Sequence, residues 1–251
     1  MLLQSNDLLT FTSLDDNAKS EITAVCIECA ERLTECHAAL SWLENYRRRV
    51  LEAWEGNKRR VIPLVPLEPV KPKAEGFLTG TRDCLRDATG LLRLGFGIRF
   101  KEDEASVFRK QGGKEAEAVK RLIPLIGEEH DLITFLRTNE DWLAELIEMR
   151  NAASHPRRER GPITIENFEF PSDGELQFPR WYRPPARPTP LIEEVSVLFG
   201  HLLMFCEGLV AHVVSHHLLS HQVRVVEDPA ARGTELPRRF YIKTDVPLAS
   251  E

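Results

Sequence analysis

The chain has 251 residues, of which 42% are hydrophobic and 29% are charged, and its formal net charge is −6 at pH 7. This length and composition allow one large domain with a full core. The negative charge argues against a surface that is basic throughout, although local basic patches on an acidic protein can still bind phosphates. No run of eighteen uninterrupted apolar residues occurs, so we expect no transmembrane helix and no membrane partner.

The cysteines and the first residues of the chain favour a cytoplasmic protein. Three of the five cysteines, Cys26, Cys29 and Cys36, share one helix face. The odd number leaves at least one cysteine without an intramolecular partner, which is typical of a reducing compartment. We interpret Cys26-x-x-Cys29 as a core pair, with a metal or redox pair as the alternative. Residues 1–16 have no basic region and do not resemble a signal peptide.

The first predicted element is a long helix over residues 17–55. Its apolar residues follow an alternating four-three spacing that only Arg47 interrupts, which is typical of a helix packed lengthwise against others. A connector is predicted over residues 62–73, where prolines recur at every third position and favour an extended, stiff spacer. A peptide-ligand role is the alternative for this connector. Its prolines are Pro63, Pro66, Pro69 and Pro72.

Three more helices are predicted after the connector. Apolar residues at helical spacing predict two of them over residues 77–96 and 114–126. The sequence Thr138-x-x-Asp141 has the form of a capping box and predicts the start of the third. This third helix should end just before Pro156, because the residue that precedes a proline avoids the helical region.

The pattern then changes to a period of two over residues 163–182, around Pro171-Ser172-Asp173-Gly174. This change predicts a β-hairpin inserted between helices. A last long helix is predicted over residues 191–221. Beyond it, the segments 223–226 and 240–243 have the character of a second small strand pair.

Together these elements predict a mainly α fold, a helical bundle with an inserted β-hairpin and a short C-terminal strand region. We expect the bundle to span residues 15–222 and to include the proline-rich connector and the hairpin. Residues 223–251 are expected to form a C-terminal extension.

The clearest functional signal is Arg150, near the end of the helix that precedes Pro156. On a helical wheel this arginine lies within about 60° of four apolar residues. A guanidinium does not lose its proton, so burying it without a partner would be costly. Arg150 therefore requires an anionic or carbonyl partner, a cleft or a second subunit. The four apolar residues are Leu143, Leu146, Ile147 and Ala153.

Arg150, Asn151 and His155 carry groups suited to RNA cleavage without a metal. Histidine has a pKa suited to proton transfer near neutral pH, and arginine can hold a phosphate and offset developing charge. Along the helix axis the outer two residues are about 7.5 Å apart, enough for a phosphodiester to lie between them. On an ideal helical wheel they point about 140° apart, so we expect His155 to swing round where the helix ends before Pro156. One histidine supplies one acid or base, and two chains related by a dyad would supply both. The structural alternative is that Arg150 satisfies helix-end carbonyls and His155 caps the helix.

The pattern Arg150-Asn151-x3-His155 resembles the R-x4-6-H signature of HEPN (higher eukaryotes and prokaryotes nucleotide-binding) domains. The resemblance implies a homodimeric helical bundle in which two motifs form a composite endoribonuclease site that needs no metal or cofactor. Arg150 would contact the scissile phosphate, Asn151 would support it and His155 would act as acid or base. Many members are toxins or antiviral effectors, which implies an antitoxin or regulatory partner. Others are non-catalytic interaction or dimerisation modules.

Two arginine-rich segments are further candidates for RNA contacts. Arg157, Arg158 and Arg160 directly follow the motif, and they would form an RNA-backbone clamp with salt-dependent binding or a solvated loop. The segment Arg180–Arg183 interleaves arginines with aromatic residues. That pattern suits base stacking, but we expect the hairpin to pack against the bundle there.

The last predicted helix contains four histidines in two i,i+4 pairs. Such a pair can ligate zinc. No glutamate stands between His212 and His216 to serve as a base, and no third ligand is evident, so we predict no metal. The four are His212, His216, His217 and His221.

Overall fold

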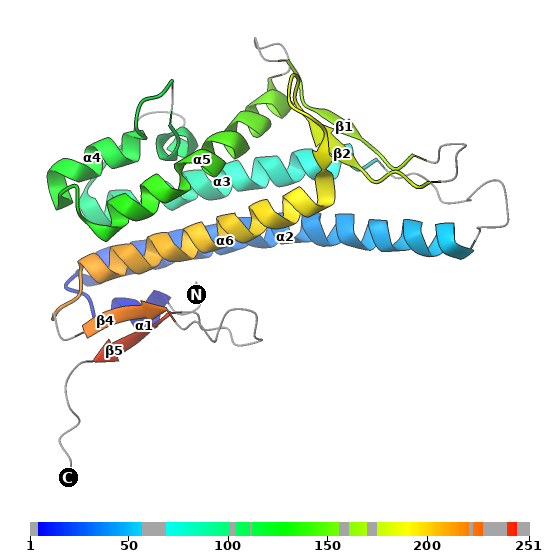
Figure 1. The fold of residues 1–251 in the computed structure, drawn as a ribbon. Helices are drawn as coiled ribbons and strands as arrows, with labels where there is room; N and C mark the ends of the chain where they lie inside the picture. The colour runs from blue at the N-terminus through cyan, green and yellow to red at the C-terminus, as the bar shows by residue number, and fades with distance from the viewer. Residues whose placement is uncertain are drawn as a thin grey trace. The chain divides into compact units, whose positions relative to one another are not determined.

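The protein is mainly helical in a computed structural model, as the sequence predicts (Figure 1). Its elements group into two compact units, and α2, α3, α5 and α6 contribute residues to both. The first unit comprises residues 1–31, 84–141 and 203–251, and the second comprises residues 32–83 and 142–202. The structure describes residues 5–56, 69–100, 104–110, 112–155, 161–169, 175–220, 223–227 and 240–244.

The helices are α1 (Ser5–Leu9), α2 (Asp16–Gly56), α3 (Lys71–Phe96), α4 (Glu117–Ile126), α5 (Asp131–Ser154) and α6 (Leu191–His216), with a 3-10 helix η2 (Glu104–Phe108). One antiparallel sheet has the strand order β1 (Thr164–Glu166), β2 (Arg180–Tyr182), β3 (Thr189–Pro190). The other pairs β4 (Val223–Glu227) with β5 (Phe240–Thr244). Both predicted strand regions are therefore confirmed. The division into a bundle over residues 15–222 and an extension over 223–251 stays a prediction.

The helix α3 begins earlier than the sequence indicated. The connector was predicted to reach residue 73, but α3 already begins at Lys71. Pro72 lies in the first helical turn, where its missing N–H would have had no partner within the helix. The carbonyl of Val70 accepts the N–H of Ala74 at 3.0 Å and closes that turn. Residues 62–68 of the predicted connector lie outside the described residues.

The predicted start of α5 at Thr138 is wrong, whereas its end at Ser154 agrees with the prediction. The helix begins at Asp131, where Nδ1 of His130 accepts the backbone N–H of Leu132 at 3.1 Å. Thr138 lies inside the helix and donates its hydroxyl to the carbonyl of Thr134 at 2.9 Å. Histidine is not among the preferred N-cap residues, so the sequence pattern did not reveal this start.

The helix α6 ends at His216, before the predicted end at residue 221. The backbone that follows it pairs with the segment between α1 and α2 in the same unit. The carbonyl of His217 accepts the N–H of Ser13 at 2.7 Å, and the N–H of Leu219 donates to Phe11 at 3.0 Å. These bonds replace the helical ones, and a helical period does not reveal such long-range pairing.

The core of the first unit brings α2, α3 and α6 together at three buried cysteines. The Sγ atoms of Cys84 and Cys206 are 3.6 Å apart, and Sγ of Cys29 lies 3.9 Å from the carbonyl oxygen of Cys84. All five cysteines are free and buried, which confirms that Cys26 and Cys29 belong to the core. Burial raises the pKa of Cys26 to about 12 and that of Cys36 to about 12.

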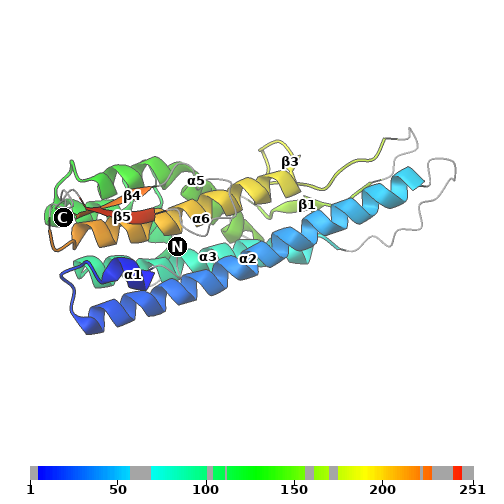
Figure 2. The same ribbon diagram turned by 90° about the horizontal axis from the view of Figure 1, so that it is seen from below.

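In the second unit, the segments of α2 and α3 lie side by side (Figure 2). The hairpin packs against α2, because the rings of Tyr46 and Phe168 meet edge to face at 5.4 Å. In the pairing of β1 with β2, Ile165 lies opposite Trp181, and the Trp181 side chain is fully buried. The hairpin therefore contributes to the core of this unit.

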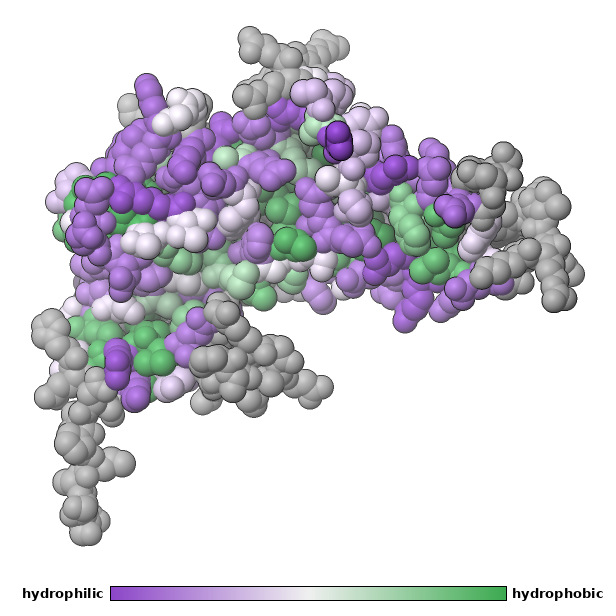
Figure 3. Space-filling model, in the orientation of Figure 1, coloured by the Kyte–Doolittle hydropathy of each residue, from purple (hydrophilic) through white to green (hydrophobic). Residues whose placement is uncertain are grey.

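Judged by its length and composition alone, the helix α6 is long and apolar enough to cross a membrane. Half of its most apolar window is buried, and the core helix of a soluble protein meets the same criteria. Large hydrophobic residues of α6 that remain exposed are Val197 and Met204. On the face seen in Figure 3, hydrophobic residues form separate patches in a mainly hydrophilic surface.

Candidate functional site

The predicted catalytic arginine lies at the edge of the core of the second unit. Leu143, Leu146 and Ile147 of α5 are 0%, 1% and 4% exposed, and Arg150, on the same stripe, is half-buried. The stripe is therefore as the sequence predicted. Arg150 also has the polar partner that its position requires: Nη1 donates to Oδ1 of Asn151 at 3.1 Å.

Asn151 connects the other two motif residues. Its side chain accepts the hydrogen bond from Arg150, and its backbone carbonyl accepts the N–H of His155 at 2.8 Å. The second bond is the last helical turn of α5, since His155 directly follows Ser154. The His155 side chain is exposed. The structure thus brings Arg150 and Asn151 into direct contact and connects His155 to them through the backbone.

The predicted RNA clamp of Arg157, Arg158 and Arg160 lies outside the described residues. Its role stays a prediction. The geometry at Arg150 agrees with a phosphate-binding role and also with a structural role at the helix end, because a guanidinium carries several N–H donors.

An open hollow of about 1120 Å³ lies between α5 and the segment that follows β2, within the second unit. We call it the α5 groove. Arg183 ties its two sides together, since Nη1 donates to the carbonyl of Glu148 at 3.2 Å and Nη2 lies 3.6 Å from the Glu148 carboxylate. The residues that line it include Glu145, Glu148 and Met149 of α5, and Tyr182, Arg183 and Arg187.

Some residues of the segment Arg180–Arg183 pack into the core, and others line the α5 groove. Trp181 is buried and donates its indole N–H to Glu194 of α6 at 2.6 Å, so the expected packing of the hairpin is confirmed for this residue. Tyr182 is half-buried and lines the α5 groove. Trp181 also lines the groove, but its side chain has no exposed surface, so Tyr182 is the ring of this segment that is open to a ligand.

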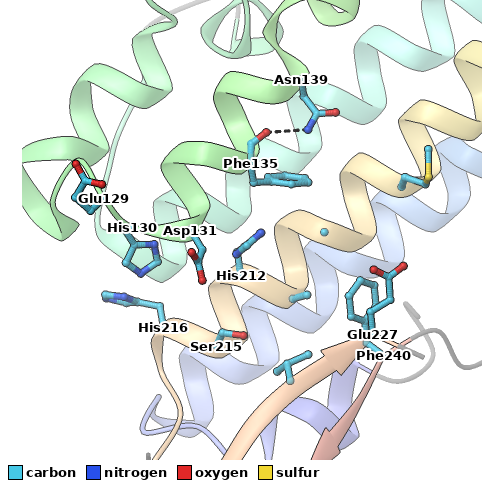
Figure 4. A pocket seen from close by; sticks show the side chains of 14 residues that line it. Glu129, His130, Asp131, Phe135, Asn139, His212, Ser215, His216, Glu227 and Phe240 are labelled. Carbon is cyan, nitrogen blue, oxygen red and sulfur yellow. Dashed lines mark hydrogen bonds between the residues drawn. The ribbon is translucent and has the colours of Figure 1, made fainter. Parts of the chain in front are cut away.

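A second pocket, of about 790 Å³, lies in the first unit and collects three histidines (Figure 4). His212 and His216 come from α6, and His130 comes from the loop before α5. The rings of His130 and His216 are 5.5 Å apart. Asp131 also lines the pocket. Sequence spacing on α6 indicated two of these histidines, but nothing in a helical period indicated His130.

The histidine pocket does not have the donor set of a metal site. Nδ1 of His130 accepts the N–H of Leu132, so a neutral ring carries its proton on Nε2 and offers no lone pair there. His217 turns away and lies 2.6 Å from the carbonyl oxygen of Gly95. Within the described part of the chain, no three histidine, cysteine or acidic residues are grouped to hold a metal ion.

Burial lowers the pKa of both α6 histidines of this pocket, which favours their neutral forms. Burial lowers the pKa of His212, with a smaller contribution from His130 and an opposing one from Asp131. Burial also lowers the pKa of His216, and His217 and His130 add to that effect. His221 lies outside the described residues.

Comparisons with protein-family models, with curated proteins and with solved structures found no match to this chain. The resemblance to HEPN domains therefore rests on Arg150, Asn151 and His155 at the end of a bundle helix.

Proposed function

We propose that the protein is a metal-independent endoribonuclease of HEPN type, which cleaves RNA by attack of a 2′-hydroxyl on the adjacent phosphorus. The observation that carries the proposal is the arrangement around Asn151. This residue bonds to the guanidinium of Arg150 and to the backbone of His155, at the end of α5 where the His155 imidazole is exposed. An arginine and an accessible histidine are thereby held about 7.5 Å apart along the helix axis, roughly 1.4 helical turns.

Each residue has a distinct role in this reaction. Arg150 binds the scissile phosphate and offsets the negative charge that develops on it. Asn151 holds Arg150 in place through its side-chain oxygen. His155 accepts the proton of the 2′-hydroxyl or gives one to the departing 5′-oxygen. The products are a 2′,3′-cyclic phosphate and a free 5′-hydroxyl.

A single copy of the site holds one histidine, so the proposal includes a homodimer that places two motifs together. In that dimer one His155 acts as the base and its symmetry mate acts as the acid. A cytoplasmic toxin or antiviral effector with such an activity requires an antitoxin or another regulatory partner, because unrestrained RNA cleavage harms the cell.

Cleavage of RNA by the purified protein in excess EDTA tests the activity. We expect wild-type protein to cleave and His155→Ala to lose about 10²-fold to 10⁴-fold in rate. His37→Ala is the matched control, because His37 is an exposed histidine on α2. Equal cleavage by wild type and His155→Ala would exclude the motif as the site.

The composite site has a test of its own. The cleavage rate per chain should rise with protein concentration over the range in which sedimentation shows dimers forming. A rate per chain that stays constant while the protein changes from monomer to dimer would contradict the composite site.

The alternative is a non-catalytic HEPN-like interaction or dimerisation module. The half-buried position of Arg150 and its bond to Asn151 agree with this alternative as well, since both are compatible with a structural arginine. Expression in a bacterial host separates the two functions. An active ribonuclease slows growth and Arg150→Ala relieves the effect, whereas a binding module leaves growth unchanged in both cases.

A further inference from the structure

We propose that the α5 groove binds the guanine base of an RNA nucleotide. This inference deepens the proposed ribonuclease function and rests on it for the meaning of the site. Binding of a free nucleotide can nevertheless be measured without any cleavage, so the two proposals can fail separately.

The groove has the size and the place of a nucleotide subsite. Ligand pockets in proteins usually have volumes of about 300–1,000 Å³, and the α5 groove, at about 1120 Å³, is open to solvent and large enough for a nucleotide. Met149 lines it and directly precedes Arg150. The groove therefore lies beside the turn of α5 that carries the predicted motif.

Tyr182 supplies a flat ring on a fixed backbone. It pairs with Thr164 across the β1–β2 ladder, and the next residue, Arg183, is bonded to the carbonyl and the carboxylate of Glu148. The Tyr182 side chain is half-buried and lines the groove. Bases of single-stranded RNA stack on such aromatic rings, and stacking alone accepts any base.

The choice of base comes from Glu145. Three glutamates line the groove, but Glu148 is paired with Arg183 and Glu194 accepts bonds from Trp181 and Thr189. Glu145 is exposed and, within the described residues, takes part in no ion pair. Its two carboxylate oxygens can accept two parallel hydrogen bonds. Guanine is the RNA base with two adjacent donors on its Watson–Crick edge, the N1–H and the 2-amino group.

Arg187 supplies the charge for the backbone of the same nucleotide. Its side chain is exposed at the groove, and among the described residues it has no acidic partner. Guanidinium groups bind phosphate oxygens through paired, charge-assisted hydrogen bonds. The α5 groove is thus lined by three groups that suit a nucleotide: Glu145 for the edge of the base, Tyr182 for its face and Arg187 for the phosphate.

Calorimetric titration with the four ribonucleoside monophosphates tests the proposal on the full-length protein. We expect GMP to bind at least about tenfold more tightly than AMP, CMP or UMP, the effect of one charge-assisted hydrogen bond. Glu145→Gln should remove this preference, because an amide offers one acceptor oxygen in place of two. Arg187→Ala should weaken the binding of all four nucleotides alike. Glu28→Gln and Arg48→Ala, on the exposed face of α2, are matched controls that should leave binding unchanged.

Two results would overturn the base-binding site: no saturable binding of GMP by folded protein, or a preference for GMP that survives Glu145→Gln. A different result would contradict the ribonuclease proposal alone. In that case GMP binds with the predicted preference, while RNA stays intact with wild type and His155→Ala alike. The reverse case, cleavage that depends on His155 but is indifferent to the base and to Glu145→Gln, would retain the ribonuclease and exclude the guanine site.

Discussion

The indole N–H of Trp181 donates to the carboxylate of Glu194 at 2.6 Å, and the Trp181 side chain is fully buried. The same carboxylate accepts the hydroxyl of Thr189. Glu194 lies in the first turn of α6, where a negative charge is also favoured by the helix dipole. One side chain therefore connects β2 and β3 to the start of α6.

Replacing Glu194 with alanine should destabilise the protein by about 1–3 kcal/mol, because the buried indole N–H loses its acceptor. The neighbouring Glu193 provides the control. It pairs with Arg47 at 2.7 Å, but its side chain is 56% exposed, so Glu193→Ala should cost less than about 1 kcal/mol. Urea unfolding of both variants measures the difference. Equal losses would show that the contact with Trp181 contributes nothing specific.

Two glycines of α6 make a second matched pair. A Cβ added to Gly208 would lie 2.6 Å from Cε2 of Phe135, whereas one added to Gly200 would meet nothing within 4 Å. Gly208→Ala should therefore cost about 1–3 kcal/mol through overpacking. Gly200→Ala should stabilise the protein by roughly 0.5–1 kcal/mol, because alanine favours the helix. Thermal unfolding measures both, and changes of the same sign would contradict the close packing of α5 and α6 at Phe135.

The helices could be predicted from the sequence because their determinants are local. The apolar spacing of α2 recurs over its whole length, and Pro156 marks the end of α5. The errors arose where a contact from a distant segment sets the boundary. His130 caps α5 through its ring, and residues 217–219 leave the helical path to pair with residues 11–13. Neither contact leaves a periodic trace in the sequence.

Glu140 shows how a buried charge can hold two helices of the first unit together. Its side chain is 1% exposed, accepts the N–H of Ala116 at the start of α4 at 3.0 Å, and lies 3.1 Å from Nζ of Lys110. Glu140→Ala should cost about 2 kcal/mol, since the buried N–H loses a charged acceptor. Asp141→Ala should change the stability by less than about 0.5 kcal/mol, because that side chain is 91% exposed. Chemical denaturation of both variants measures these losses. A larger loss for Asp141→Ala than for Glu140→Ala would contradict the role of Glu140.

The candidate sites were predictable to different degrees. The position of Arg150 on an apolar stripe follows from one helix, and its half-burial agrees with the wheel. The α5 groove and the histidine pocket each need segments that are distant in sequence. Glu145 and Arg187 line one hollow, at which Arg183 bonds the chain after β2 to Glu148. Sequence spacing therefore indicated the motif but neither of the two cavities beside the helices.

Acid should weaken the folded state through His212. Burial lowers the pKa of His212 from its ordinary value of 6.5, so the unfolded chain takes up this proton more readily than the folded protein. Well above pH 6.5 both states are neutral at this position and the residue has no effect on stability. As the pH falls through 6.5 toward the lowered value, the unfolded state binds more protons and the free energy of unfolding decreases.

The contribution can be isolated by measuring urea unfolding at about pH 7.5 and about pH 5.5. His212→Gln should lose less stability between the two than the wild type does, because the glutamine does not titrate. His37→Gln, which removes an exposed histidine from α2, should keep the wild-type loss. His216, whose pKa is lowered by burial and by His217 and His130, continues to titrate in both variants. The loss of stability between the two pH values should therefore be smaller in His212→Gln than in the wild type, but not zero. A loss equal to that of the wild type would mean that the His212 ring is not buried in the folded protein.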